Sequence, residues 1–164
     1  MENIHQHLIY QLNLLVEMAK DGQKGYENAA IDINDDLLKK SFLMWAKERE
    51  VYANQLQQEV HNLDGIAEHS GGAFGGLHRL WMDMKSIFTS GDKVAIINAC
   101  ITGEETAIQE YKKIINDTPA GAIKRLMTDQ MQGIERILSD LKSRLPSSRP
   151  NPVFQKKAAT AFRE

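Results

Sequence analysis

Apolar residues recur along most of the chain at steps of three and four, which is the spacing of one face of an α-helix. Four long rows of this kind cover residues 4–31, 36–63, 92–116 and 119–144. No stretch shows the strict alternation that is typical of a half-buried strand. We therefore predict an all-α fold with four long helices.

The segments that join these helices differ in length. Turn and capping residues at 34–36 link the first helix to the second, and Thr118 with Pro119 is expected to start the last helix. Gly65 is expected to end the second helix in a left-handed conformation. Short links join antiparallel neighbours, whereas a long crossover lets the second and third helices run parallel. The sequence therefore predicts a four-helix bundle with one long crossover.

The crossover covers residues 66–91. It begins with a glycine-rich run at 70–76, which we interpret as a flexible turn, and continues as a short amphipathic helix at 77–88. One face of this helix is apolar and consists of Leu77, Leu80, Trp81, Met84 and Phe88. We expect that face to pack on the bundle; the alternative is that it docks a protein partner.

The predicted bundle occupies residues 1–145, and residues 146–164 form a tail of different composition. The tail contains three prolines and two adjacent serines, and it is slightly basic. This composition is typical of a flexible segment. Two short apolar groups at 153–154 and 158–162 offer a second way to dock on a partner or a neighbouring subunit.

Polar side chains interrupt three of the apolar rows near the middle of their helices, at Arg49, Glu104 and Gln130. A carboxylate on the buried face needs a partner, because an unpaired buried charge is too costly to keep. We therefore expect the Arg49 guanidinium to donate to Glu104, with Gln130 completing a structural polar layer. Glu105, one residue off the row, competes with Glu104 for this role.

Three tyrosines lie on the same rows: Tyr26, Tyr52 and Tyr111. We expect them to be core rings whose hydroxyls join the polar layer, rather than redox residues. Cys100 lies near the buried face and is expected to be an inert thiol of the core. None of the five histidines falls midway along a predicted long helix, so we expect no histidine ligand at the height of the layer.

Residues in all four helices and in the crossover carry a resemblance to known proteins. They are Asp21, Gly22, Gly25, Tyr26, Glu27, Ala30, Glu48, Arg49, Ser70, Gly71, Gly75, His78, Arg79, the run 81–85, Gly103, Glu104, Tyr111, Gln130, Gly133 and Ile134. With these residues the chain resembles the ferritin-like four-helix-bundle superfamily. Within it, the chain is most similar to a small bacterial family whose function is not established. The likeness spans residues 4–145.

The resemblance implies a place for two iron ions, held by a carboxylate from each of two helices and a Glu-x-x-His pair from each of the others. Most of these ligands are missing. Glu104 stands seven residues before Tyr111, as the superfamily pattern expects, but Ala19 stands seven before Tyr26. The places of the two Glu-x-x-His pairs are taken by Arg49-x-x-Tyr52 and Gln130-x-x-Gly133.

Two functions remain open from these residues. We interpret the chain first as a non-catalytic ferritin-like bundle without a metal cofactor, which acts by binding or by forming a homodimer. The alternative is an iron-storage or oxidase protein that holds iron or manganese with a non-standard ligand set. Its candidate ligands are Glu104, Glu27, Glu48 and Glu105.

Composition adds a few exclusions. The chain is 42% hydrophobic and 26% charged, which is ordinary for a globular protein, and its net charge of −2 gives no electrostatic case for nucleic acid. A single cysteine excludes an internal disulfide and a cysteine-based zinc site. No apolar run approaches the roughly 20 residues that span a bilayer, and the N-terminus lacks a signal pattern. We expect a cytoplasmic location.

Overall fold

The computed structural model describes residues 2–66 and 75–147, and at residues 2, 3, 75–78, 80 and 81 the backbone alone. Within these ranges the chain forms five helices and no strand. They are α1 (Glu2–Asp32), α2 (Asp36–Asn62), α3 (Gly75–Thr89), α4 (Lys93–Asp117) and α5 (Ala122–Ser143). The predicted all-α class is confirmed for the described part of the chain.

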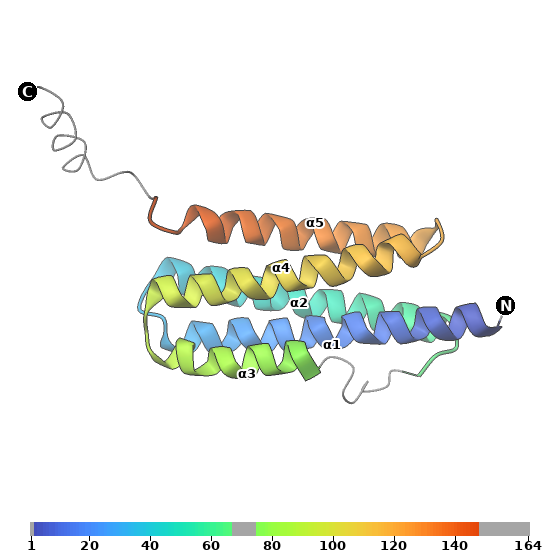
Figure 1. The fold of residues 1–164 in the computed structure, drawn as a ribbon, viewed down its shortest axis with the longest axis horizontal. Helices are drawn as coiled ribbons and strands as arrows, with labels where there is room; N and C mark the ends of the chain where they lie inside the picture. The colour runs from blue at the N-terminus through green and yellow to red at the C-terminus, as the bar shows by residue number, and fades with distance from the viewer. Residues whose placement is uncertain (1, 67–74, 148–164) are drawn as a thin grey trace, which may run out of the picture.

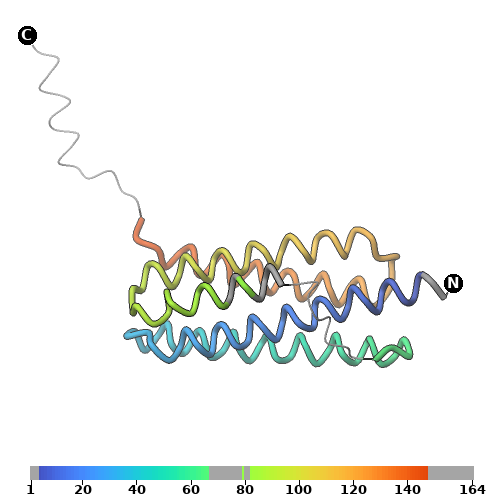
Figure 2. Tube along the Cα trace, turned by 60° about the horizontal axis from the view of Figure 1, so that its bottom comes forward, coloured from blue at the N-terminus to red at the C-terminus, as the bar shows by residue number. Residues whose placement is uncertain are grey.

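The four long helices lie lengthwise beside one another (Figure 1). α1 packs antiparallel along α2, and α4 packs antiparallel along α5, so the chain folds as two helical hairpins. The shorter α3 lies against α1 and α4, and α2 and α4 run in the same direction. The rotated view in Figure 2 shows the same lengthwise arrangement.

Aspartates begin two of the long helices. The carboxylate of Asp35 accepts a hydrogen bond from the Leu38 backbone N–H at 2.9 Å, and that of Asp92 accepts one from Ala95 at 3.1 Å. Each bond satisfies one of the donors that the first turn of a helix leaves without an intrahelical partner. The predicted capping turn at 34–36 is therefore confirmed.

The start of the last helix differs from the prediction. α5 begins at Ala122, after Gly121, and not at Pro119. Thr118 ends α4 instead: its hydroxyl donates to the Ile114 carbonyl at 2.7 Å. Gly121 occupies the N-cap position of α5, where no side chain caps the helix.

The end of α2 is a second difference. Asp64, and not Gly65, has the positive φ, at 56°. A Cβ atom on Gly65 would lie 2.8 Å from a methyl carbon of Ile9, which is closer than packed carbon atoms approach. The glycine therefore allows the chain to pass close to α1, and the left-handed turn falls on the residue before it.

The core fills the space between the four long helices and under α3. Its largest fully buried side chains are Tyr26, Tyr111, Phe42, Phe88, Leu12, Leu15, Leu38, Leu56, Ile96, Ile97, Met127 and Ile134. Met84 and Phe88 are the described part of the apolar face of α3, and both are buried, as expected for a face that packs on the bundle. The side chains of Leu77, Leu80 and Trp81 lie outside the described residues.

Two other predictions fall on parts of the chain outside the described residues. They are the glycine-rich turn, of which residues 70–74 are affected, and the basic tail from residue 148 onward. Among the described residues, no helix is long and apolar enough to cross a membrane.

Candidate polar site in the bundle interior

A buried ion pair joins α2 to α4 in the middle of the molecule. The Arg49 guanidinium donates through Nη2 to Oε2 of Glu104, and the Tyr26 hydroxyl on α1 donates to Oε1 of the same carboxylate. Arg49 is 2% exposed and Glu104 is 1% exposed. Both carboxylate oxygens therefore have a donor, one of them a full positive charge. We call these three residues the Glu104 cluster.

Helical periodicity explains why these side chains meet. Tyr26, Arg49 and Glu104 each sit on the apolar row of their helix, so packing of the rows brings them inside. Gly22, one turn before Tyr26, faces the stem of Arg49. A Cβ atom there would lie 3.6 Å from Cγ of the arginine. Arg49 Nε is buried and has no hydrogen-bond partner among the described residues.

Burial and charge set the protonation states in this cluster. Burial by itself lowers the pKa of Arg49, but the adjacent Glu104 carboxylate raises it, and the net shift is upward. Burial, reinforced by Glu104, raises the pKa of Tyr26 well above its usual value and also raises that of the Cys100 thiol. At neutral pH Arg49 therefore stays charged, and the Tyr26 hydroxyl and the nearby Cys100 thiol keep their protons, as suits an inert thiol.

Gln130 belongs to a separate hydrogen-bonded group. Its Oε1 accepts from the Tyr111 hydroxyl at 2.8 Å, and its Nε2 donates to Gln55 Oε1 at 2.9 Å. A longer contact of 3.4 Å joins Nε2 to the Tyr52 carbonyl. Gln130 is not hydrogen-bonded to the Glu104 cluster, so it does not complete one layer with Arg49 as the sequence led us to expect.

Distance along α4 explains the separation. Tyr111 follows Glu104 by seven residues, which is two helical turns or about 10 Å along the axis. A side chain on α5 that meets Tyr111 therefore lies at a different height from Arg49. The polar interior consists of two levels, and the Tyr111 hydroxyl, whose pKa burial raises, belongs to the second level.

Tyr52 takes part in a third group at the α2–α5 surface, which we call the Glu48 cluster. Its hydroxyl donates to Oε1 of Glu48, and Arg136 Nη2 lies 3.2 Å from the same oxygen. The Tyr52 ring still faces the interior, with the Arg49 guanidinium carbon 6.0 Å from its centroid. Its hydroxyl, however, is directed to the surface carboxylate and not to Glu104.

The carboxylates of the alternative metal site are not brought together. Glu27 is exposed and accepts a hydrogen bond from Gln23 at 2.9 Å, whereas Glu105 is exposed and pairs with Lys142 at 2.8 Å. Glu48 and Glu104 are engaged in the two clusters described above. Among the residues that the structure describes, no three His, Cys, Asp or Glu side chains form a group that could hold a metal ion. This donor set does not fit a two-metal centre.

Two further residues take part in these groups although the sequence analysis assigned them no role there. Gln55 looks like an ordinary polar residue of an exposed helix face, yet it completes the hydrogen bonding of Gln130. Gly133 lies under Tyr52, where a Cβ atom would be 1.9 Å from the hydroxyl oxygen. A glycine inside a helix lowers helix stability, so its presence at mid-helix is the signal that could have indicated this close approach.

Comparison with known families gives one result. The model of a family described as "Domain of unknown function (DUF2383)" matches residues 7–117, more than half of the chain. The chain belongs to the DUF2383 family. The DUF2383 match includes the whole Glu104 cluster on α1, α2 and α4, whereas Gln130 and the rest of α5 lie outside it. A search of curated proteins found no match.

Proposed function

We propose that this DUF2383 protein is a non-catalytic helical scaffold that acts by self-association. The observation that carries the proposal is the engagement of Glu104, whose two oxygens accept from Arg49 and Tyr26. A carboxylate that coordinates a metal needs at least one oxygen directed to the ion. In this chain a guanidinium supplies the positive charge that the interior acid requires. The Glu104 cluster thus has a structural role, which is to join α1, α2 and α4.

We further propose that the bundle is ferritin-like. Two features support this relationship: the antiparallel pairs α1–α2 and α4–α5, and the shared direction of α2 and α4 across a long connection that contains α3. This is the topology of ferritin-like bundles with one long crossover. We therefore propose that this chain has the architecture of that superfamily without its iron chemistry.

The alternative, a protein that holds iron or manganese with a non-standard ligand set, makes a different measurable prediction. We expect less than one equivalent of metal in the purified protein by elemental analysis. A ligand that binds only the folded state raises the melting temperature. Because we propose no metal site, adding Fe²⁺ or Mn²⁺ should leave the melting temperature unchanged. Two equivalents of bound metal together with a higher melting temperature would establish the alternative and overturn the scaffold.

The surface that we propose for self-association is an exposed row on α2. Leu37, Met44 and Val51 recur every seven residues, and all three are exposed. In an antiparallel pairing of two copies centred on Met44, Leu37 of one copy would face Val51 of the other. In the same register Lys40 would face Glu48 of the second copy, so the charges are complementary as a two-fold interface requires.

Size-exclusion chromatography with light scattering tests this surface. We expect the mass of a dimer for the natural chain and of a monomer for Met44→Glu, because the substitution places two carboxylates together at the two-fold axis. Met82→Glu, at an exposed methionine on α3, is the matched control and should remain a dimer. A monomeric natural chain at all concentrations, or a dimeric Met44→Glu, would overturn this interface. A cytoplasmic location, which suits the single buried cysteine, remains a prediction.

A further inference from the structure

A cavity of about 430 Å³ opens at the end of the bundle where α1 begins and the chain turns from α4 into α5, on the right in Figure 1. Its lining comes from the first turns of α1, from residues 117–123 and from Glu59 of α2. No residue of the Glu104 cluster or of the exposed α2 row lines it, so the proposed function does not use this cavity.

Gln11 presents an unpartnered polar group to this cavity. The residue is 6% exposed, and its side-chain amide makes no hydrogen bond within the described part of the chain. Neither amide atom is fully enclosed, since the enclosed side-chain atoms without a partner are Asn13 Oδ1 and Arg49 Nε. Buried polar groups in folded proteins normally have partners, so an occupant that bonds to this amide fits here.

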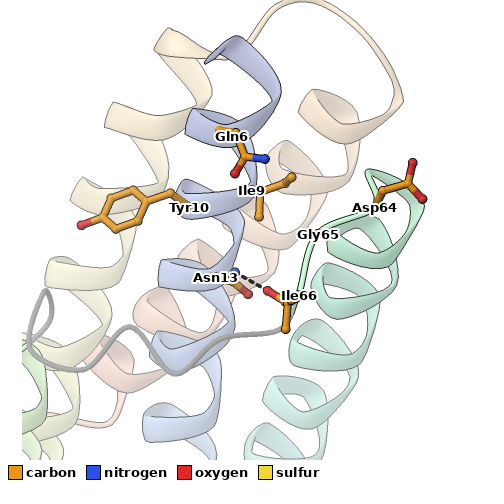
Figure 3. A pocket seen from close by; sticks show the side chains of 7 residues that line it. All are labelled: Gln6, Ile9, Tyr10, Asn13, Asp64, Gly65 and Ile66. Atoms are coloured by element: carbon orange, nitrogen blue, oxygen red, sulfur yellow. Dashed lines mark hydrogen bonds between the residues drawn. The ribbon is translucent and has the colours of Figure 1, made fainter. Parts of the chain in front are cut away.

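A second buried amide on α1 shows how Gln11 differs. Asn13 follows it by two residues, which turn a helix by about 200°, so the two side chains lie on nearly opposite faces. Asn13 Nδ2 donates to the Ile66 carbonyl at 3.0 Å (Figure 3), and its Oδ1 is enclosed by the protein. Asn13 therefore holds the segment after α2 against α1, whereas the Gln11 amide remains accessible to a ligand.

The start of α5 adds hydrogen-bond donors to the same cavity. Gly121 occupies the N-cap position, and no side chain caps the helix. Ala122 and Ile123 follow it and line the cavity, and the N–H groups in the first turn of a helix have no intrahelical acceptor. An acceptor atom in the cavity can therefore bond to α5 as well as to Gln11 Nε2.

Carboxylates predominate among the charged groups of the lining. Glu59 and Asp117 both line the cavity, and no Lys or Arg does. The Lys124 ammonium lies close by, but it donates to the Thr118 carbonyl at 3.0 Å. An anionic ligand would meet both carboxylates and is therefore disfavoured.

Hydrogen bonding selects the class of ligand. A carboxylate has no donor for Gln11 Oε1, and an ammonium group has no acceptor for Gln11 Nε2 or for the α5 N–H groups. A primary carboxamide carries a carbonyl oxygen and an NH₂ group in one plane, as Gln11 itself does, so the two amides can form a pair of hydrogen bonds.

Apolar side chains supply a surface for a hydrocarbon chain. Leu8 and Ile123 are half-buried in the lining, and Ile4, which also lines the cavity, is 63% exposed. Covering this surface with a hydrocarbon chain is favourable by the hydrophobic effect. His5 and His7 are exposed, and because an imidazole can donate or accept, they do not oppose a neutral ligand.

We propose that this cavity binds a small primary carboxamide with a short hydrocarbon chain. Its carbonyl oxygen accepts from Gln11 Nε2 and from the first turn of α5, and its NH₂ group donates to Gln11 Oε1. The hydrocarbon chain packs against Leu8 and Ile123. The volume of the cavity limits the ligand to a small molecule.

Titration of the full chain with isovaleramide, followed by ¹⁵N NMR, tests the proposal. We expect saturable shifts of the Gln11 side-chain amide and of the backbone amides of Ala122 and Ile123. Three ligands of matched shape serve as comparisons: methyl isobutyl ketone, which has a methyl group in place of NH₂, the anionic isovalerate and the cationic isopentylammonium. Each should bind at least about fivefold more weakly, because each leaves a hydrogen-bonding group of the site unpaired.

Either of two results would overturn the proposal. Absence of shifts at these positions at millimolar isovaleramide would leave water as the partner of the Gln11 amide. Equal or tighter binding of any comparison ligand would reject the carboxamide as the class of ligand.

A substitution separates the amide pair from the apolar contacts. Gln11→Met keeps the length of the side chain without its polar atoms, so the preference for isovaleramide over methyl isobutyl ketone should fall from about fivefold to none. Gln109→Met, at an exposed glutamine of α4, is the matched control and should keep that preference. A preference that survives Gln11→Met contradicts the assignment. If this variant does not fold, the four ligands measured on the natural chain still decide the proposal.

Discussion

The Glu104 and Glu48 clusters are built from the same three kinds of side chain in different surroundings. In each, a glutamate accepts from a tyrosine hydroxyl and from an arginine. The Glu104 side chain is 1% exposed, whereas 26% of the Glu48 side chain and 73% of the Arg136 side chain are accessible to water. The comparison separates the chemistry of the contact from the effect of burial.

Burial should decide how much each cluster matters for stability. Water can replace any partner that Glu48 loses, so an exposed ion pair contributes little. A buried carboxylate has no such replacement, and removal of its partner leaves an uncompensated charge in a medium of low polarity. The same contact is therefore dispensable at the surface and required in the interior.

The largest expected effect comes from removing each arginine. Arg49→Met leaves Glu104 buried and unpaired and should lower the free energy of unfolding by about 3–5 kcal/mol in urea denaturation. Arg136→Met is the matched change at the surface, and we expect its effect to lie within the error of the measurement. Adding Glu104→Gln to Arg49→Met removes both charges and should restore part of the lost stability. Equal effects of the two arginine changes would contradict this view of the clusters.

The next effect concerns the tyrosine hydroxyls. Tyr26→Phe leaves one oxygen of Glu104 without a donor and should lower the free energy of unfolding by about 1.5–3 kcal/mol, the range for hydrogen bonds to charged groups. Tyr52→Phe removes the corresponding donor to Glu48, where water can take its place, and should have less than half that effect. The same urea denaturation experiment measures both effects. A larger loss of stability for Tyr52→Phe would contradict the view that the buried hydroxyl matters more than the one at the surface.

A smaller effect distinguishes the glycines that lie next to the two clusters. A Cβ atom on Gly22 would make an ordinary contact of 3.6 Å with Arg49, so Gly22→Ala should stabilise the protein by about 0.5–1 kcal/mol through helix propensity. At Gly133 a Cβ atom would lie 1.9 Å from the Tyr52 hydroxyl oxygen, so Gly133→Ala must displace that ring. We expect thermal denaturation to show opposite signs for the two changes. If Gly133→Ala stabilised the protein instead, Tyr52 would have to move aside without any loss of stability.

These contrasts also show which features the sequence could predict. The burial of Arg49 and Glu104 follows from helical periodicity, because both interrupt an apolar row. The partner of Gln130 depends on the relative height of α4 and α5, which periodicity does not determine. The apolar rows that contain the tyrosines predict that the rings are buried, but they do not predict where each hydroxyl points. The Tyr52 hydroxyl, for example, donates to Glu48, one turn earlier on the same helix.

The ends of the helices could also be predicted only in part from the sequence. Thr118 stands between two helices, and its hydroxyl donates back into α4, whereas α5 starts only at Ala122. A residue pattern identifies the capping group but not which of two helices it serves. Gly65 likewise marked the end of α2 correctly, although for packing against Ile9 rather than for its own dihedral angle.

The smallest expected effect is one that the two tyrosines share, a fall in stability at alkaline pH. Burial raises the pKa of both Tyr26 and Tyr52 above the value near 10 that a tyrosine has in an unfolded chain, and the adjacent Glu104 and Glu48 carboxylates add to the rise. Above pH 10 the unfolded chain releases these protons while the folded chain retains them. The unfolded state then binds fewer protons, so stability is complete below pH 10 and falls as the pH rises.

Urea denaturation between pH 8 and pH 11 measures this dependence. Tyr26→Phe and Tyr52→Phe should each flatten the alkaline fall in stability, and to a similar extent, because the folded-state pKa of both tyrosines lies above this pH range. Because each variant is compared with itself at pH 8, loss of the hydroxyl bond at neutral pH does not enter the result. An alkaline fall that Tyr26→Phe leaves unchanged would assign the effect to Tyr111 or Cys100, whose pKa values burial also raises. In that case, ionisation of Tyr26 would not weaken the Glu104 cluster.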